Sequence, residues 1–184
     1  MRLIVILSLL LVGMVLFAEE SAAAAEGQAG TPAQMEDAIK EAHRYFASDF
    51  FNKCWELMNK TERTPDEDLQ MINLSHASCA HWQIVGTAEN WVVGEWQLSR
   101  VYAQLNRAEP CLYHADTCMR LCKENNIGGL NLGFAYEALA RAQHLLGNDE
   151  VAKEFIELGK KVAEDITEKN DHDYLLKELN TVLN

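Results

Sequence analysis

Apolar residues recur at three- and four-residue steps along most of the chain, which is the pattern of amphipathic α-helices. From Trp91 to Leu105 this pattern predicts one helix, and residues 106–110 read as the turn that follows it. Pro110 fits the first turn of the next helix, where its missing N–H is not needed. The apolar stripe of that second helix is Cys111, Leu112, Ala115, Cys118, Leu121 and Cys122. The two helices together predict a helical hairpin.

The same plan returns 41 residues later, with Gly147, Asn148 and Asp149 as the stop, the turn and the new N-cap. Six pairs of positions keep their size class across this offset: Leu98 and Leu139, Ser99 and Ala140, Asn106 and Gly147, Cys111 and Ala152, Ala115 and Ile156, and Cys118 and Gly159. A lone hairpin cannot bury its apolar stripe, whereas stacked neighbours share a continuous core. The offset therefore predicts two stacked copies of one hairpin.

A weaker copy precedes these two, and a short helix follows them. Helical patterning runs from Ala33 to about Lys60, and a second helix is predicted from Pro65 to Val85, ending at Gly86. Thr64 and Glu67 have the spacing of a capping box at the start of that second helix. Residues 174–183 form a short amphipathic pattern that suits a cap on the last hairpin. The predicted fold class is all-α, with about three stacked antiparallel hairpins and a C-terminal capping helix.

The hairpins resemble the tetratricopeptide repeat, which is marked by Leu and a small residue, then an aromatic, a turn Gly and further small residues. The matching positions are Leu98, Ser99, Tyr102, Asn106, Cys111, Ala115 and Cys118, and then Leu139, Ala140, Gln143, Gly147, Ala152, Ile156 and Gly159. Gln143 departs from the aromatic and Asn106 from the Gly. The family repeat has about 34 residues, and the seven extra residues here amount to about two helical turns. From about Phe50 onward the chain is also similar to a group of uncharacterised bacterial proteins, a likeness that implies the fold and no activity.

The N-terminus has the pattern of a secretory signal. Met1 and Arg2 are followed by an uncharged apolar run, residues 3–18, and by small residues at 22–25. We therefore expect a signal peptide at 1–25, a flexible lead at 26–32 and the repeat domain at 33–184. The protein is expected to be exported, either periplasmic or secreted. The alternative is a membrane anchor formed by an uncleaved segment, although the apolar run is shorter than the roughly 20 residues that span a bilayer.

The formal net charge of −12 argues against nucleic acid or an anionic membrane surface as a partner. We expect no stable membrane insertion after signal removal. A cationic partner and a merely solvated acidic surface both stay open, as does the oligomeric state.

The five cysteines are interpreted as packing residues. Cys111, Cys118 and Cys122 share one helix face, and their mates one repeat later are Ala152, Gly159 and Ala163. Small mates indicate small buried side chains rather than metal ligands. Whether Cys54 and Cys79 pair is left open by the spacing.

The resemblance implies a ligand site on the concave face, which the first helices of the hairpins line. It assigns the ligand-facing places to Asn52, Trp55, Asn59, Trp96, Arg100, Gln104, Glu137, Arg141 and His144. Two guanidinium groups suit a carboxylate or an acidic peptide, and two indoles supply contact area. The alternative is that Trp96 packs into the core and both arginines pair with acids such as Glu95 or Glu137. The expected function is non-enzymatic binding of a protein or peptide segment, with no cofactor.

A rival hypothesis places a metal or hydrolytic site at His76, His81, Glu95 and His114. It requires three or four of these side chains to converge. His76 and His81 are five residues apart, which separates them by roughly 140° around a helix. Hydrogen-bonded imidazoles that tie helices together are the simpler interpretation. A scaffolding role for the convex face is a third hypothesis.

Overall fold

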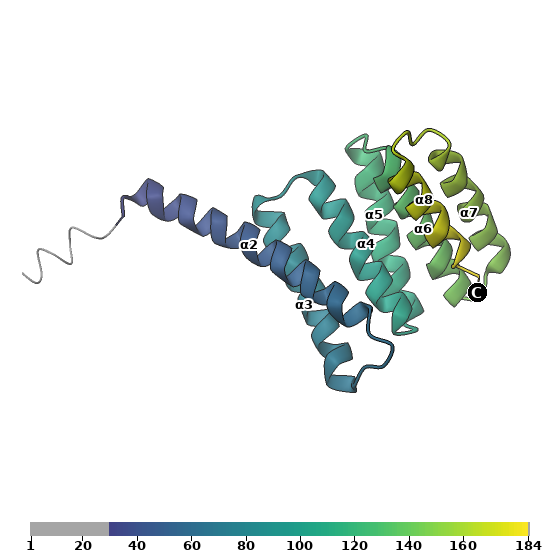
Figure 1. Ribbon diagram of the computed structural model, residues 1–184, viewed down its shortest axis with the longest axis horizontal. Coiled ribbons are helices and arrows are strands. Elements are labelled where there is room, and N and C mark those ends of the chain that lie inside the picture. Colours follow the sequence, from purple (N-terminus) through teal and green to yellow (C-terminus); the bar gives the residue numbers. More distant parts are fainter. Residues whose placement is uncertain (1–29, 184) are drawn as a thin grey trace, which may run out of the picture. The chain divides into compact units, whose positions relative to one another are not determined.

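The computed structural model describes residues 30–183, and these form α-helices without any strand, which confirms the all-α prediction (Figure 1). The predicted signal peptide and residues 26–29 of the predicted lead lie outside the described residues. The helices are α2 (Pro32–Met58), α3 (Pro65–Val85), α4 (Ala88–Gln104), α5 (Ala108–Glu124), α6 (Gly129–Leu145), α7 (Asp149–Ala163) and α8 (Lys169–Asn180).

The chain divides into two units, of which the second, Lys40–Asn184, contains the folded core. The described part of the first unit is the start of α2, whose residues are exposed. There Thr31 Oγ1 accepts a hydrogen bond from Gln34 N at 3.3 Å, and Gln34 Oε1 accepts one from Thr31 N at 2.7 Å. This reciprocal pair is a capping box, and it fixes the start of α2 at Pro32.

The 41-residue offset reappears in the helix boundaries. Ala88 and Gly129 begin α4 and α6, and Ala108 and Asp149 begin α5 and α7, each pair 41 residues apart. Leu98 and Leu139, which the repeat equates, are both buried in helices that pack side by side. The repeat in the sequence is therefore a repeat in the secondary structure.

Three helices end in the same way. Asn106, Asn126 and Gly147 have φ values of 53°, 54° and 80°, the left-handed conformation common just after a helix. The next residue in each case, namely Arg107, Ile127 and Asn148, donates its N–H to a carbonyl five residues back at 2.9 Å. Asn106 thus takes the conformation of Gly147, so its departure from the family pattern leaves the turn intact.

Two predicted boundaries are corrected. The helix expected from Trp91 begins at Ala88, because Asn90 Oδ1 accepts the Thr87 N–H at 2.9 Å and caps an earlier start. The C-terminal helix expected at 174–183 spans Lys169–Asn180. Its first turn is polar and solvent-facing, and Lys169 forms an ion pair with Asp173 one turn on. The sequence pattern missed that turn because it contains no apolar residue.

The core consists of two clusters of buried side chains. The larger cluster joins α4 to α8, and the smaller one holds Cys54, Met58, Met71 and Val101 from α2, α3 and α4. All five cysteines are buried and none forms a disulfide. The prediction that Cys111, Cys118 and Cys122 are small packing residues is confirmed by their place in the larger cluster.

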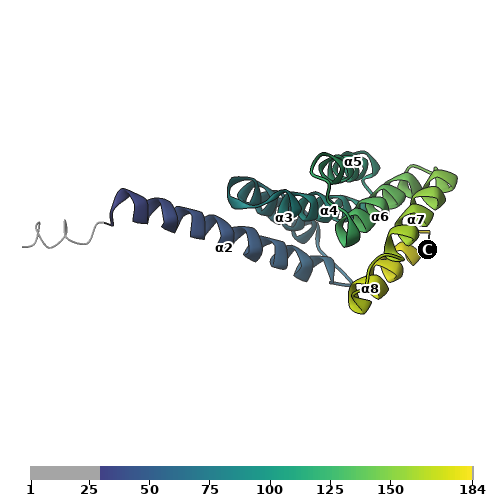
Figure 2. The same cartoon turned by 90° about the horizontal axis from the view of Figure 1, so that it is seen from above.

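The helices of the second unit are arranged around the α4–α6 layer. Figure 2 shows α5 on one side of α4 and α6, and α8 on the opposite side. The C-terminal part of α2 packs on α3 and α4, where Phe51 O accepts a hydrogen bond from Gln97 Nε2 at 3.0 Å and Met58 O one from Gln104 Nε2 at 3.1 Å. The faces of α4 and α6 opposite α5 thus lie between α2 and α8.

Candidate functional site

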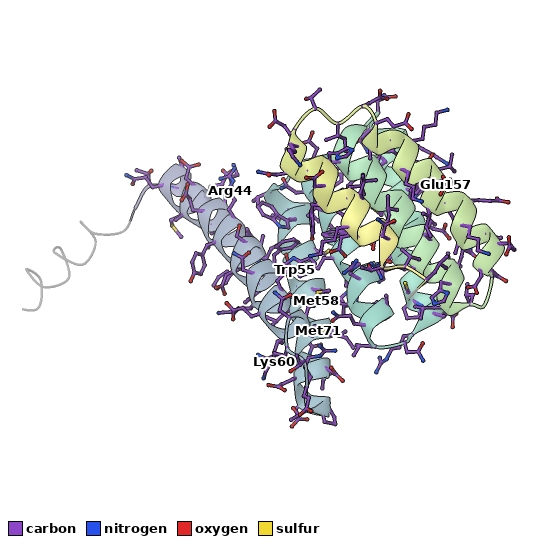
Figure 3. All side chains as sticks on the ribbon, turned by 45° about the vertical axis from the view of Figure 1, so that its right-hand side comes forward. Arg44, Trp55, Met58, Lys60, Met71 and Glu157 are labelled. Carbon is purple, nitrogen blue, oxygen red and sulfur yellow. The ribbon has the colours of Figure 1, made fainter. Side chains whose placement is uncertain are left out.

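A row of aromatic side chains follows the alternate helices α2, α4, α6 and α8. We define the aromatic row as Trp55, Trp96, Phe134 and Tyr174, one residue from each helix in that order. The ring centroids are 5.6 Å apart for Trp55 and Trp96, 4.5 Å for Trp96 and Phe134, and 5.3 Å for Phe134 and Tyr174. Figure 3 shows Trp55 on α2 together with Met58. These spacings are typical of favourable aromatic pairs, so the row stabilises the stack. Trp96 and Phe134 are buried, whereas Tyr174 is 39% exposed.

The aromatic row borders a cavity of about 300 Å³, which we call the aromatic cavity. Its lining comes from the same four helices and from no other element: Phe51, Trp55, Val92, Val93, Trp96, Leu130, Asn131, Phe134 and Tyr174. A concave, mostly apolar cavity with a polar group at its edge is the usual form of a ligand site. We refer to the surface between α2 and α8, with α4 and α6 as its floor, as the groove.

A second cavity of about 320 Å³ adjoins the first and shares Phe51, Val93 and Asn131 with it. Its remaining lining is Ser48, Asn52, Trp82, Glu89 and Asn90, so we call it the polar cavity. The groove therefore offers an apolar compartment beside one with amide groups and a carboxylate.

A buried ion-pair network lies deeper between α4, α6 and α8. The Glu137 carboxylate is 0% exposed and accepts hydrogen bonds from Trp96 Nε1 at 2.9 Å, from Arg100 Nη1 at 2.6 Å and from Arg141 Nε. Arg100 Nη1 also donates to Glu178 Oε2 at 2.7 Å, and Arg141 Nη2 donates to Glu178 O at 3.0 Å. Two guanidinium groups thus face two carboxylates, and their charges balance.

The directions of the pKa shifts of Glu137 and Arg100 agree with both of these groups being charged. Burial by itself raises the pKa of Glu137, but Arg100 and Arg141 outweigh burial and hold it below the usual value. Burial lowers the pKa of Arg100, while Glu137 and Glu178 raise it, and the net direction is upward. An ionised carboxylate that is completely buried is tolerated only when it is paired and hydrogen-bonded in this way.

A third cavity of about 430 Å³ opens beside this network and is lined by Arg100, Ala103, Gln104, Arg141, His144, Leu145, Glu178, Thr181 and Val182. Both arginines line this cavity, but their charges are compensated by the carboxylates of Glu137 and Glu178. A carboxylate ligand would have to compete with Glu137 and Glu178 for the same donors.

The structure separates the nine residues predicted for the site. Asn52 lines the polar cavity, and Trp55 and Trp96 line the aromatic cavity. Arg100, Gln104, Arg141 and His144 line the third cavity, and His144 Nδ1 contacts Asp149 Oδ1 at 2.7 Å. Asn59 is exposed just after the end of α2. Glu137 lies beneath the groove surface rather than on it, because two arginines and an indole enclose it.

Sequence reasoning missed most of the cavity lining, including Phe51, Glu89, Phe134, Tyr174 and Glu178. The repeat contained a signal for two of them, since Tyr174 lies three repeat lengths after Phe51 and Glu178 lies one after Glu137. Helix α8 therefore follows the register of a first helix of a fourth hairpin. Extending the offset past Asp165 would have placed α8 beside the groove.

The histidines of the rival hypothesis do not converge on one point. Each of them contacts a side chain of a neighbouring helix. His76 Nε2 contacts Tyr102 OH at 2.9 Å, and His114 Nδ1 contacts Glu95 Oε2 at 2.7 Å. His81 instead contacts His43 on α2 at 2.8 Å between Nδ1 atoms. Within residues 30–183, no three His, Cys, Asp or Glu side chains are placed to hold a metal ion.

Comparison with protein-family models, with curated proteins and with solved structures found no match. In the part of the chain that the structure describes, no helix combines the length and the apolar character needed to cross a bilayer.

Proposed function

We propose that this protein is a non-enzymatic binding module of the tetratricopeptide-like class, and that its groove holds a segment of a peptide or protein. The observation that carries the proposal is the aromatic cavity, because each of the four alternate helices contributes an aromatic side chain to it. Aromatic side chains dominate the binding energy of protein interfaces. They also lose little conformational entropy when a ligand covers them.

The groove also has features that suit a peptide backbone. Asn52 and Asn131 carry amide groups, each with both donors and acceptors, beside the aromatic cavity. An extended peptide has the same two kinds of group along its length. A site of this kind aligns a chain through its amides and selects it through one anchored side chain.

The N-terminal pattern supports a proposed site of action outside the cytoplasm. A signal peptide at 1–25 would deliver the module to the periplasm or the medium, and an uncleaved segment would instead tether it to the membrane.

The rival metal or hydrolytic site has less support. Its four residues divide into the His76, Glu95 and His114 region and the separate His81–His43 contact. Stoichiometric zinc or iron in the purified protein would favour this rival.

The test removes two groove aromatics that do not belong to the buried core clusters. Phe51 is half-buried and Tyr174 is 39% exposed, so Phe51→Ala with Tyr174→Ala opens the cavity edge. Binding to an array of short acetylated peptides should fall about tenfold or more, since interface anchors contribute upwards of about 2 kcal/mol. Tyr113→Ala on α5 makes the same truncation at a side chain that is 67% exposed and does not line the groove cavities. Equal peptide binding by all three proteins would remove the proposal.

A further inference from the structure

The charge of the ligand can be inferred from which groove charges are already compensated. The charged side chains that line the three cavities are Glu89, Arg100, Arg141 and Glu178, with Glu137 buried below them. Both arginines donate to Glu137 and to Glu178, so these four charges cancel. The remaining charge belongs to Glu89, which is exposed and has no ion pair within the described residues.

Glu89 is placed to act on a ligand that also enters the aromatic cavity. It is an exposed residue in the first turn of α4, on the helix that also contributes Val92, Val93 and Trp96 to the aromatic cavity. The polar cavity that it lines adjoins the aromatic cavity, because Phe51, Val93 and Asn131 line both of them. One ligand can therefore reach the aromatic row and the Glu89 carboxylate at the same time.

The rest of the molecule also favours a positively charged ligand. The net charge of −12 attracts cations at long range, and such steering raises association rates with oppositely charged partners. Aromatic faces attract cations as well. A ligand carboxylate would be repelled by the negative net charge. The two arginines that could bind it already pair with Glu137 and Glu178.

We propose that the groove selects a basic, apolar peptide segment, in which a large apolar side chain fills the aromatic cavity and a nearby Lys or Arg pairs with Glu89. This proposal rests on the peptide-binding function proposed above and specifies its ligand. The proposed ligand is basic, whereas the two arginines in the sequence suggested an acidic one.

The experiment uses the full chain and labelled peptides in a Gly-Ser background, each with one Trp. A first array varies the spacing from that Trp to a Lys. At the best spacing, the Lys is then replaced by Gln and by Glu, and affinities are measured by fluorescence anisotropy. We expect the Gln peptide to bind about three- to fivefold more weakly, the upper part of the range for one exposed ion pair. The Glu peptide should bind about tenfold more weakly or worse, because like charges repel.

The variant Glu89→Gln should remove the preference for the Lys peptide over the Gln peptide. Glu154→Gln is the matched control, since it deletes the same charge from an exposed position on α7 that lines none of the groove cavities. The control should keep the preference. Raising the salt concentration should shrink it in the wild-type protein by screening.

The outcomes separate this inference from the binding function. If the Glu peptide binds best, or if Glu89→Gln keeps the preference for Lys, the basic-ligand inference is wrong. The binding function still stands in that case, provided that Phe51→Ala with Tyr174→Ala weakens peptide binding about tenfold or more. If no peptide binds, or if only a neutral oligosaccharide does, both proposals are wrong.

Discussion

Glu137 shows how one residue ties three helices together. It belongs to α6, and it holds Trp96 and Arg100 of α4 and Arg141 of its own helix. Both arginines extend the network to Glu178 on α8. At the equivalent positions of α2 and α4 the repeat has Trp55 and Trp96, so a carboxylate replaces an indole where the arginines converge.

We expect Glu137→Gln to lower the free energy of unfolding by about 3 kcal/mol or more, because it leaves two partly buried guanidinium groups short of a counter-charge. Urea denaturation of the variant and the wild type measures the difference. Glu154→Gln, at an exposed position, should change the free energy by less than about 0.5 kcal/mol. A similar small change in both variants would contradict a structural role for the network.

The same carboxylate makes stability depend on acid pH. Its pKa in the folded protein lies below the usual 4.5. The unfolded chain therefore takes up the proton first, and the stabilisation present above that pH is lost as the pH falls. Urea midpoints measured from pH 6 downward should fall more steeply below about pH 4.5 for the wild type than for Glu137→Gln.

Two histidines of α3 make the stability of the fold depend on pH below 6.5 as well. Burial lowers the pKa of His81, and its partner His43 lowers it further. Burial also lowers the pKa of His76, with His114 adding to the shift and Glu95 opposing it. A depressed pKa means that stability is full above the usual value of 6.5 and declines as the pH falls below it.

The expected result is a lower urea midpoint at pH 5.5 than at pH 7.5, with a smaller difference in His76→Gln and in His81→Gln. His172→Gln is the control, because the side-chain contact of His172 is with its chain neighbour Asp173, at 3.0 Å between Nδ1 and Oδ1. An identical pH dependence in all four proteins would show that other groups control this range.

At the scale of the element, the N-terminus of helix α3 is fixed by a capping box. Thr64 Oγ1 accepts from Glu67 N at 3.3 Å, and Glu67 Oε2 accepts from Thr64 N at 2.9 Å. The predicted capping box is therefore confirmed. Thr64→Ala should lower the free energy of unfolding by about 1 kcal/mol, measured by urea denaturation. Thr61→Ala, in the exposed bend before it, should have little effect. Equal losses would mean that the cap is dispensable.

Helix α8 is held by two leucines that lie over two glycines. A Cβ added at Gly133 of α6 would lie 2.3 Å from Leu175 Cδ2, and one at Gly159 of α7 would lie 2.9 Å from Leu179 Cδ2. Both leucines are almost fully buried. The glycines thus provide the close approach that lets α8 pack on both helices of the preceding hairpin.

Leu175→Ala should lower the free energy of unfolding by about 3 kcal/mol, within the range for buried leucines. It should also speed amide exchange in α8, which depends on this contact. Leu69→Ala is the control because Leu69 is 57% exposed on α3. An unchanged stability for Leu175→Ala would mean that α8 contributes little to the fold.

At the scale of the whole molecule, the two core clusters differ in size. The smaller one joins α2 and α3 to α4 through four buried residues, whereas the larger one links five helices. Stability in repeat proteins is a sum over neighbouring units. The α2–α3 hairpin is therefore expected to open before the rest of the chain.

The cysteines provide a probe of this order. Burial raises the pKa of Cys54 and that of Cys79 to about 12, so both should be inert in the native state. In rising urea, a thiol reagent should modify Cys54 and Cys79 before Cys111, Cys118 and Cys122 of α5, as mass spectrometry of labelled peptides can show. Simultaneous labelling of all five would instead indicate a single cooperative unit.

What the sequence determined by itself is local and periodic. Apolar periodicity, the Thr64 cap and the turn residues Asn106 and Gly147 predicted the helices and their 41-residue repeat, because each of these signals acts within one or two helical turns. The same offset placed Trp55 and Trp96 on one face. The polar first turn of α8 was not predicted, because periodicity is detected only where apolar residues occur.

The tertiary structure decided which charged groups meet. Arg100 and Glu178 are 78 residues apart in the chain, yet they pair because α4 and α8 both border α6. No local pattern shows whether a guanidinium faces solvent, a ligand or a buried carboxylate, since that depends on how the helices pack. Packing therefore neutralised the arginines that the sequence offered to a ligand and left Glu89 as the uncompensated charge lining the groove among the described residues.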